Sequence, residues 1–256
     1  MREFFIDDVA GIPFNLFGWV HFLCIAVTLV GLFYIYINRD KIVKMNYNVK
    51  KKIKLLIVII MFLNMKLYYI PLLLYGRYDW TNHLPLHFCF ISGYLFMFAL
   101  LTDNRRLYKL TYFFSFMGPI PAILLPDSSL ASSFDSFLFY QYFISHHFFL
   151  VANSFIFYAY NHHFSLNDVK RAFFVSNVIF VTMALFNFVF KTNYIMSNSL
   201  PPHVIELFPF LRNVQHPFII LEITGMLILV IAYIPIYFRN KEKTLNSGLQ
   251  PVESLL

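Results

Sequence analysis

The stretch LPLHFCFISGYLFMFALL, residues 84–101, is an apolar run without Asp, Glu, Lys or Arg, and it has the length that a membrane helix needs. A histidine and a cysteine, His87 and Cys89, lie near its start. Ionisable groups inside a membrane segment are costly and are candidates for function by default. We interpret the rest of the chain as the protein that surrounds this polar position.

The composition of the whole chain indicates the same class of protein. Hydrophobic residues make up 59% of the sequence, including 33 Phe and 17 Tyr, and charged residues only 13%, which is far more apolar than a soluble domain. We therefore predict one integral membrane domain, residues 1–256, in the cell membrane. The net charge of +7 is spread between apolar runs, so we expect membrane lipid rather than nucleic acid as the partner.

Seven apolar runs predict helices, and the fold class is therefore an all-α, polytopic membrane bundle with about seven transmembrane helices. The predicted helices are about 17–37, 53–75, 84–101, 110–125, 137–160, 172–190 and 217–238. The fourth is short and contains Gly118, Pro119 and Pro121. We expect it to be kinked or broken and packed against its neighbours, because only buried backbone tolerates such a break in a membrane.

The distribution of basic residues predicts the orientation. Most Lys and Arg residues fall in the loops after the first, third and fifth predicted helices and in the C-terminal tail. Basic loops stay on the cytoplasmic side of a membrane. The N-terminus is therefore predicted to lie outside and the C-terminus inside.

Several polar side chains then fall in the outer half of the bilayer, at about 1.5 Å of helix per residue. Polar residues placed for unrelated packing reasons would occupy both halves, so we predict one shared pocket in the outer leaflet. The residues concerned are His21, Lys66, His87, Cys89, His146, Asn187 and Glu222.

The two adjacent histidines of the fifth predicted helix differ in the residues that share their face. His146 and His147 point about 100° apart, so at most one faces the pocket. His146 shares a face with Tyr142 and Asn153. We therefore select His146, with Tyr142 beside it.

Each candidate also has a structural interpretation. His21 and Asn187 are close enough to the interface to be headgroup contacts. Lys66 and Glu222 would also satisfy each other as an ion pair between the second and seventh predicted helices. Cys89 alone is typical of a small buried hydrophobic residue.

Neither a local nucleophile–base pair nor a metal site follows from the spacing. His87 and Cys89 are two residues apart and lie on nearly opposite faces, so a base for Cys89 must come from another helix. His83 and His87 share a face at i and i+4, but the sequence offers no clear third ligand. We predict no metal and no cofactor.

The order of several motifs resembles the YwaF-type bacterial integral membrane family over nearly the whole chain. That family has no settled activity. Through this resemblance Asn193 joins the candidates for substrate binding. The motifs are Leu84-Pro85-Leu86-His87-Phe88-Cys89, Phe143-Ile144-Ser145-His146, Phe186-Asn187 with Thr192-Asn193-Tyr194, and Leu221-Glu222 before Ala232-Tyr233-Ile234-Pro235.

More distantly, the chain resembles a eukaryotic transmembrane acyltransferase that remodels ether phospholipids through a cysteine and a histidine. Its Asn-Pro-Cys-His motif falls on Leu84-Pro85-Leu86-His87, so Leu86 stands where the eukaryotic protein has cysteine. Cys89 lies one helical turn further on the same face as Leu86. The eukaryotic histidine matches His146, and the resemblance thus implies a pair of Cys89 and His146.

Three functions remain open on the sequence. The first is lipid acyl transfer or hydrolysis, with Cys89 as nucleophile, His146 as base, and an oxyanion stabilised by His87, Asn187 or Lys66. The second is binding or transport of a lipid headgroup, a small solute or a proton. The third is a non-catalytic membrane factor. Beside the catalytic pair, the substrate-binding candidates are His21, Lys66, His87, Tyr142, Asn187, Asn193 and Glu222.

Overall fold

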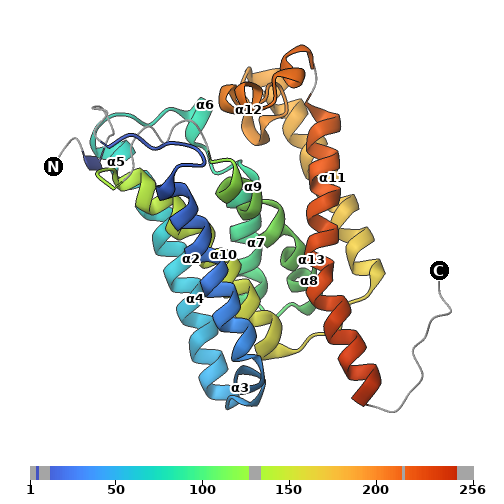
Figure 1. The fold of residues 1–256 in the computed structure, drawn as a ribbon. Helices are drawn as coiled ribbons and strands as arrows, with labels where there is room; N and C mark the ends of the chain where they lie inside the picture. The colour runs from blue at the N-terminus through green and yellow to red at the C-terminus, as the bar shows by residue number, and fades with distance from the viewer. Residues whose placement is uncertain (1–3, 6–11, 127–133, 215–216, 247–256) are drawn as a thin grey trace.

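The computed structural model describes residues 4–5, 12–126, 134–214 and 217–246 (Figure 1). The regular secondary structure of this part of the chain is helical, with no strand. The prediction of an all-α fold is therefore confirmed. Helices lie in each of the seven stretches that the sequence marked as helical.

Four helical segments are long and apolar enough to cross a membrane. They are α2 (Trp19–Ile37), α4 (Tyr47–Leu67) with its continuation α5 (Tyr69–Leu74), α11 (Leu166–Phe190), and α13 (Phe218–Asn246) up to Glu242. The apolar helix α7 (Phe88–Leu101) is shorter. The 24-residue α10 (Phe137–Tyr160) is long enough, but its polar residues lower its mean hydropathy.

The helix α10 keeps those polar residues because it packs against five other helices. Eleven of its residues are buried, and it packs against α2, α4, α3 (Arg39–Lys44), α8 (Arg105–Met117) and α9 (Pro119–Leu124). A helix that meets protein on most of its faces can satisfy polar groups with neighbouring helices rather than with lipid.

The fourth predicted helix is broken, as expected. It consists of α8 and α9, joined at Gly118. Pro119 and Pro121 have no N–H to continue the helical ladder. The helix α7 packs between α4 and α8, and on its other side α8 contacts α11 and α13. The broken helix α8–α9 therefore stands in the middle of the molecule, with α2 and α4 on one side and α11 and α13 on the other (Figure 1).

The short helices lie at the two ends of the bundle. The helix α3 lies at one end, and α5, α6, α9 and α12 lie at the other (Figure 1). The remaining elements are α6 (Trp80–His83), η1 (Tyr194–Met196), α12 (Pro202–Leu207) and η2 (Pro209–Asn213).

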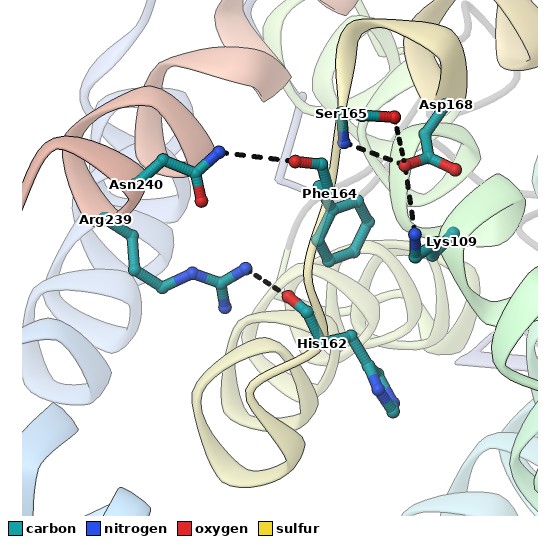
Figure 2. Close-up of polar contacts among 7 residues, drawn as sticks. All are labelled: Lys109, His162, Phe164, Ser165, Asp168, Arg239 and Asn240. Atoms are coloured by element: carbon teal, nitrogen blue, oxygen red, sulfur yellow. Dashed lines mark hydrogen bonds and ion pairs between the residues drawn. The ribbon is translucent and has the colours of Figure 1, made fainter. Parts of the chain in front are cut away.

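At the end opposite α6, the last helix holds the loop between α10 and α11 (Figure 2). Arg239 is 9% exposed, and it donates hydrogen bonds to the carbonyl oxygens of Phe157 and His162. Its guanidinium also lies 3.8 Å from the centroid of the Phe157 ring. Asn240 Nδ2 donates to Phe164 O at 3.3 Å. The end of α13 is thereby fixed to a loop that lies far from it in sequence.

The start of α11 is held on the other side of the same loop (Figure 2). Asp168 accepts a hydrogen bond from the Ser165 N–H at 2.8 Å, which caps the helix. The same carboxylate pairs with Lys109 of α8 at 3.1 Å. This ion pair ties α11 to the central broken helix.

The histidine of this loop, His162, leads to a pH prediction. Burial, followed by the nearby cations Arg105 and Lys109, lowers the pKa of His162 to about 4 from an ordinary 6.5. Between these two pH values the unfolded chain binds a proton that the folded protein does not, so stability falls as the pH decreases through this window. Thermal unfolding in detergent at several pH values measures the slope.

His162→Gln should reduce this slope by the share of one protonating group, because the variant has no group at this position that protonates only on unfolding. His163→Gln changes the exposed neighbouring histidine and should keep the slope. Equal slopes in the two variants would assign the pH dependence to other groups.

Candidate functional site

Cys89 lies against the break between α8 and α9. It is the second residue of α7 and is partly buried. A Cβ atom added to Gly118 would lie 2.9 Å from Cys89 Sγ and 3.2 Å from its Cα, closer than real contacts allow. The missing side chain of Gly118 is therefore what lets the thiol approach the break.

The short helix α9 is held at its C-terminal end by two other helices. The last carbonyls of a helix lack partners within it. The Tyr142 hydroxyl of α10 donates to Ala122 O at 2.9 Å. The His21 imidazole of α2, which is fully buried, bonds Ile123 O through Nε2 at 2.7 Å. These two side chains fix the broken segment between α2 and α10.

The hydrogen bonds of His21 occupy both of its ring nitrogens. The Phe17 N–H donates to Nδ1 at 3.0 Å, so the neutral ring carries its proton on Nε2 and donates it to the Ile123 carbonyl. The sequence offered a headgroup contact or a pocket residue for His21. The structure instead shows a buried side chain that joins the start of α2 to α9.

His146 has the opposite tautomer. Its Nδ1 lies 2.6 Å from Tyr142 O, and a carbonyl can only accept, so Nδ1 carries the proton. Nε2 of the neutral ring is then a lone-pair acceptor, and it forms no hydrogen bond with a described residue. The ring also packs on Tyr142, with 4.4 Å between centroids. The Nε2 lone pair of His146 is therefore available to accept a proton.

Cys89 of α7 lies against the break itself, whereas His146 of α10 is linked to α9 through Tyr142. Phe96 of α7 and Phe149 of α10 pack with centroids 5.2 Å apart. Cys89 precedes Phe96 by two turns and His146 precedes Phe149 by three residues, which offsets the pair by about 6 Å along the bundle. No hydrogen bond joins the thiol and the imidazole among the described residues. The thiol and the imidazole are thus offset by about one helical turn along the bundle.

Asn187 organises the loop after α11. It is fully buried, and its Oδ1 accepts from Thr192 Oγ1 at 2.6 Å and from the Tyr194 N–H at 3.0 Å. Its Nδ2 donates to Tyr194 O and to Ser197 Oγ, both at 2.7 Å. The expectation of a headgroup contact for Asn187 is wrong, because its amide is buried and its four bonds are all internal.

Tyr194 connects this loop to the segment that precedes α7. Its hydroxyl donates to Trp80 O and accepts from the Leu84 N–H at 3.0 Å. Its ring meets His87 with centroids 5.1 Å apart and planes at 68°. Two of the motifs that carried the family resemblance, Leu84–His87 and Thr192–Tyr194, thus lie together next to Cys89.

Asn193, in contrast, is exposed and bonds only within its own loop. Its Nδ2 donates to Ser199 O at 3.0 Å, and its Oδ1 accepts from the Asn198 N–H at 3.0 Å. These bonds are those of a residue that stabilises a turn.

Lys66 and Glu222 lie on opposite sides of the molecule. Lys66 is exposed on α4 and bonds weakly to the Tyr94 hydroxyl, at 3.4 Å. Glu222 of α13 accepts from Asn177 of α11 at 2.9 Å. The ion pair between the second and seventh predicted helices is therefore wrong, because α4 and α13 are separated by the central helices (Figure 1).

Sequence reasoning missed one polar cluster, which joins α4 to α10. Gln141 Nε2 donates to Ser145 Oγ at 3.0 Å and to Asn64 Oδ1 at 3.3 Å, and Ser145 Oγ also contacts Asn64 Oδ1. Gln141 and Ser145 stand at i and i+4 of one helix, the spacing that would have revealed a shared polar face. The cluster joins the two helices as buried polar side chains do in membranes.

The part of the chain that the structure describes contains no evident metal-binding site. Among the described residues, no three His, Cys, Asp or Glu side chains form a group that could hold a metal ion. The two grooves described between helices are apolar, and none of the nine candidate residues lines them.

The comparisons with known proteins agree with the class of the fold. The model of the TMEM164 family, a membrane protein family, matches residues 16–233. This range runs from the start of α2 into α13 and contains all nine candidate residues. Comparisons with curated proteins and with solved structures found no match. Its apolar helices and this match over most of its length show that the chain is a membrane protein that belongs to the TMEM164 family.

Proposed function

We propose that the protein transfers acyl groups between membrane lipids, or hydrolyses them, through Cys89 and His146. The observation that supports the proposal is that the Cys89 thiol lies against the break at Gly118, while His146 packs on Tyr142, whose hydroxyl bonds α9 after the break. The tautomer of His146 leaves its Nε2 as an acceptor. The distant resemblance to a eukaryotic acyltransferase with a cysteine and a histidine supports the same chemistry.

The reaction would proceed through a thioester. Cys89 Sγ attacks the ester carbonyl of a lipid, and His146 Nε2 accepts the thiol proton. The new S–C bond forms as the ester C–O bond breaks, and His146 returns the proton to the leaving alkoxide. A hydroxyl of an acceptor lipid, or water, then attacks the thioester with His146 as base, and the proton finally restores the thiol.

The oxyanion of this reaction would be stabilised by the start of α7. The Phe90 and Ile91 N–H groups donate to His87 O, and no side chain caps the helix. The preceding N–H groups of Phe88 and Cys89 therefore remain for a developing negative charge, at the positive end of the helix dipole. We assign oxyanion stabilisation to this pair of backbone N–H groups rather than to Lys66 or Asn187. Lys66 lies on the outside of α4, and the amide of Asn187 is used in internal hydrogen bonds.

Trapping of the intermediate tests the proposal. The purified protein in nanodiscs is incubated with a phospholipid that carries an isotopically labelled acyl chain, and the acylated peptide is identified by mass spectrometry. The label should be found on Cys89, should be absent in Cys89→Ala and should remain in Cys24→Ala. A transport or non-catalytic role predicts no thioester, and label retained in Cys89→Ala would also overturn the proposal.

We further propose that seven helical segments cross the cell membrane, with the N-terminus outside and the C-terminus in the cytoplasm. The basic loops support this orientation. In a variant with Cys24 and Cys89 replaced by Ala, a cysteine at Glu206 should react with an impermeant maleimide on intact cells. A cysteine at Asn48 should react only after permeabilisation. Both positions are exposed, and the reverse labelling would overturn the orientation.

A further inference from the structure

An apolar groove of about 440 Å³ runs between α4 and α7 on the outside of the bundle. Val58 and Met97, which are 7% and 4% exposed, line it together with residues that project outward. Phe62, Phe98 and Leu101 are each between 47% and 59% exposed. The groove is therefore a depression in the surface of the protein that meets the membrane.

Lys66 lies beside this groove without an acidic partner. Its Nζ is 5.3 Å from the ring centroid of Phe62, one turn earlier in α4, and 5.7 Å from that of Tyr94, and both rings line the groove. No carboxylate of a described residue forms an ion pair with it. The ammonium group thus contacts aromatic rings and one neutral hydroxyl.

The depth of Lys66 excludes a lipid headgroup as its usual counter-ion. Lys66 precedes Leu74, the end of this candidate span, by about 12 Å of helix, and its side chain turns back toward Phe62, away from that end. The ammonium is thus near the centre of a hydrocarbon layer about 30 Å thick. Lipid phosphates lie at the two edges of that layer, and an unpaired charge at the centre is costly.

We propose that the α4–α7 groove binds a transmembrane helix of a partner protein, and that an Asp or Glu of this helix pairs with Lys66. A carboxylate at the middle of a membrane is carried by a helix rather than by a phospholipid. The groove extends from Leu55 to Leu63 along α4, about 12 Å, which fits two turns of a helix packed ridge into groove. This interface is independent of the proposed acyl transfer.

A second copy of the chain fits this site poorly. The acidic residues within its candidate spans are Asp168 and Glu242, at the ends of their spans, and Glu222, which follows the start of its span at Phe218 by four residues. It therefore lies about 6 Å from the outer end of its helix. Lys66 is at least twice as deep, so the two charges do not meet between parallel copies.

Model helices test the proposal in vesicles of neutral phosphatidylcholine. Synthetic Leu/Ala transmembrane helices with Glu, Gln or Leu at the centre carry an acceptor dye, and the full-length protein carries a donor dye. Energy transfer should show at least about tenfold tighter binding of the Glu helix than of the Leu helix. Lys66→Met should abolish this preference, and Lys66→Glu should instead prefer a helix with a central Lys.

Lys191→Met is the matched control, because Lys191 also lies over an aromatic ring, 4.8 Å from the Phe188 centroid, at the end of α11. It should leave the preference unchanged. Equal binding of the three helices, or a preference that survives Lys66→Met, would overturn the proposal. Loss of the preference in vesicles with anionic lipid would also overturn the proposal and would assign Lys66 to lipid. Association between copies of the protein that depends on Lys66 and needs no added helix would overturn it as well.

Discussion

His146→Gln is expected to slow formation of the Cys89 thioester by about a hundred- to ten-thousand-fold, the usual contribution of a general base. Glutamine keeps a polar side chain on α10 but cannot accept the thiol proton. In the wild-type protein, the bond from Nδ1 to Tyr142 O fixes the ring with Nε2 as the acceptor. The measurement is the initial rate of acylation from an activated acyl ester, with protein folding checked by thermal unfolding.

The adjacent histidine supplies the control for this experiment. His147 lies about 100° around the helix from His146, and its ring packs on Phe143 at 5.6 Å between centroids. His147→Gln should keep the acylation rate within a few-fold of the wild type. If both variants lost activity equally, or if His146→Gln kept it, the assignment of His146 as base would be wrong.

Asn187→Ala should lower the free energy of unfolding by about 2–4 kcal/mol, because it leaves the buried N–H and C=O of Tyr194 without partners. The loop would also release the contact of Tyr194 with the Leu84 N–H. That contact positions the start of α7, so acylation of Cys89 should fall together with stability. Chemical unfolding in detergent measures the first effect, and the acylation rate measures the second.

Asn193→Ala is the matched variant in the same loop. Asn193 is exposed, and its side chain bonds to Ser199 and Asn198 in the same loop. Water replaces those bonds, so the expected loss is about 1 kcal/mol or less. Equal losses in the two variants would contradict the idea that burial of the Asn187 amide holds the loop onto α7.

Some parts of the site were predictable because they depend on residues close in sequence. The break at Gly118 and Pro119 follows from the missing N–H of proline and from the short apolar run around it. The neighbourhood of His146 and Tyr142 was also predictable, because residues at i and i−4 share a helix face. The structure shows that pair in contact, with the ring of His146 bonded to Tyr142 O. The choice of His146 over His147 as a functional residue stays a prediction.

The partners of the polar residues were not predictable in the same way. In a soluble protein, an apolar stripe marks the buried face of a helix, but in a membrane protein the faces toward lipid and toward other helices are both apolar. Lys66 was grouped into the interior pocket because it falls in the same half of the bilayer as the other polar residues, yet it lies on the outside of α4. Similarly, nothing local shows that His21 meets Ile123, which lies 102 residues away.

The sequence by itself determined the class of the protein, its helical stretches and the position of the break, because hydrophobicity, chain length and the geometry of proline act locally. Only the tertiary structure decided which helices are neighbours. It packed α10 between α2, α4 and the broken helix, set Cys89 against Gly118, and joined Asn187 through Tyr194 to the start of α7. These contacts depend on side chains that fit across helices distant in sequence, and such complementarity leaves no repeating pattern along the chain.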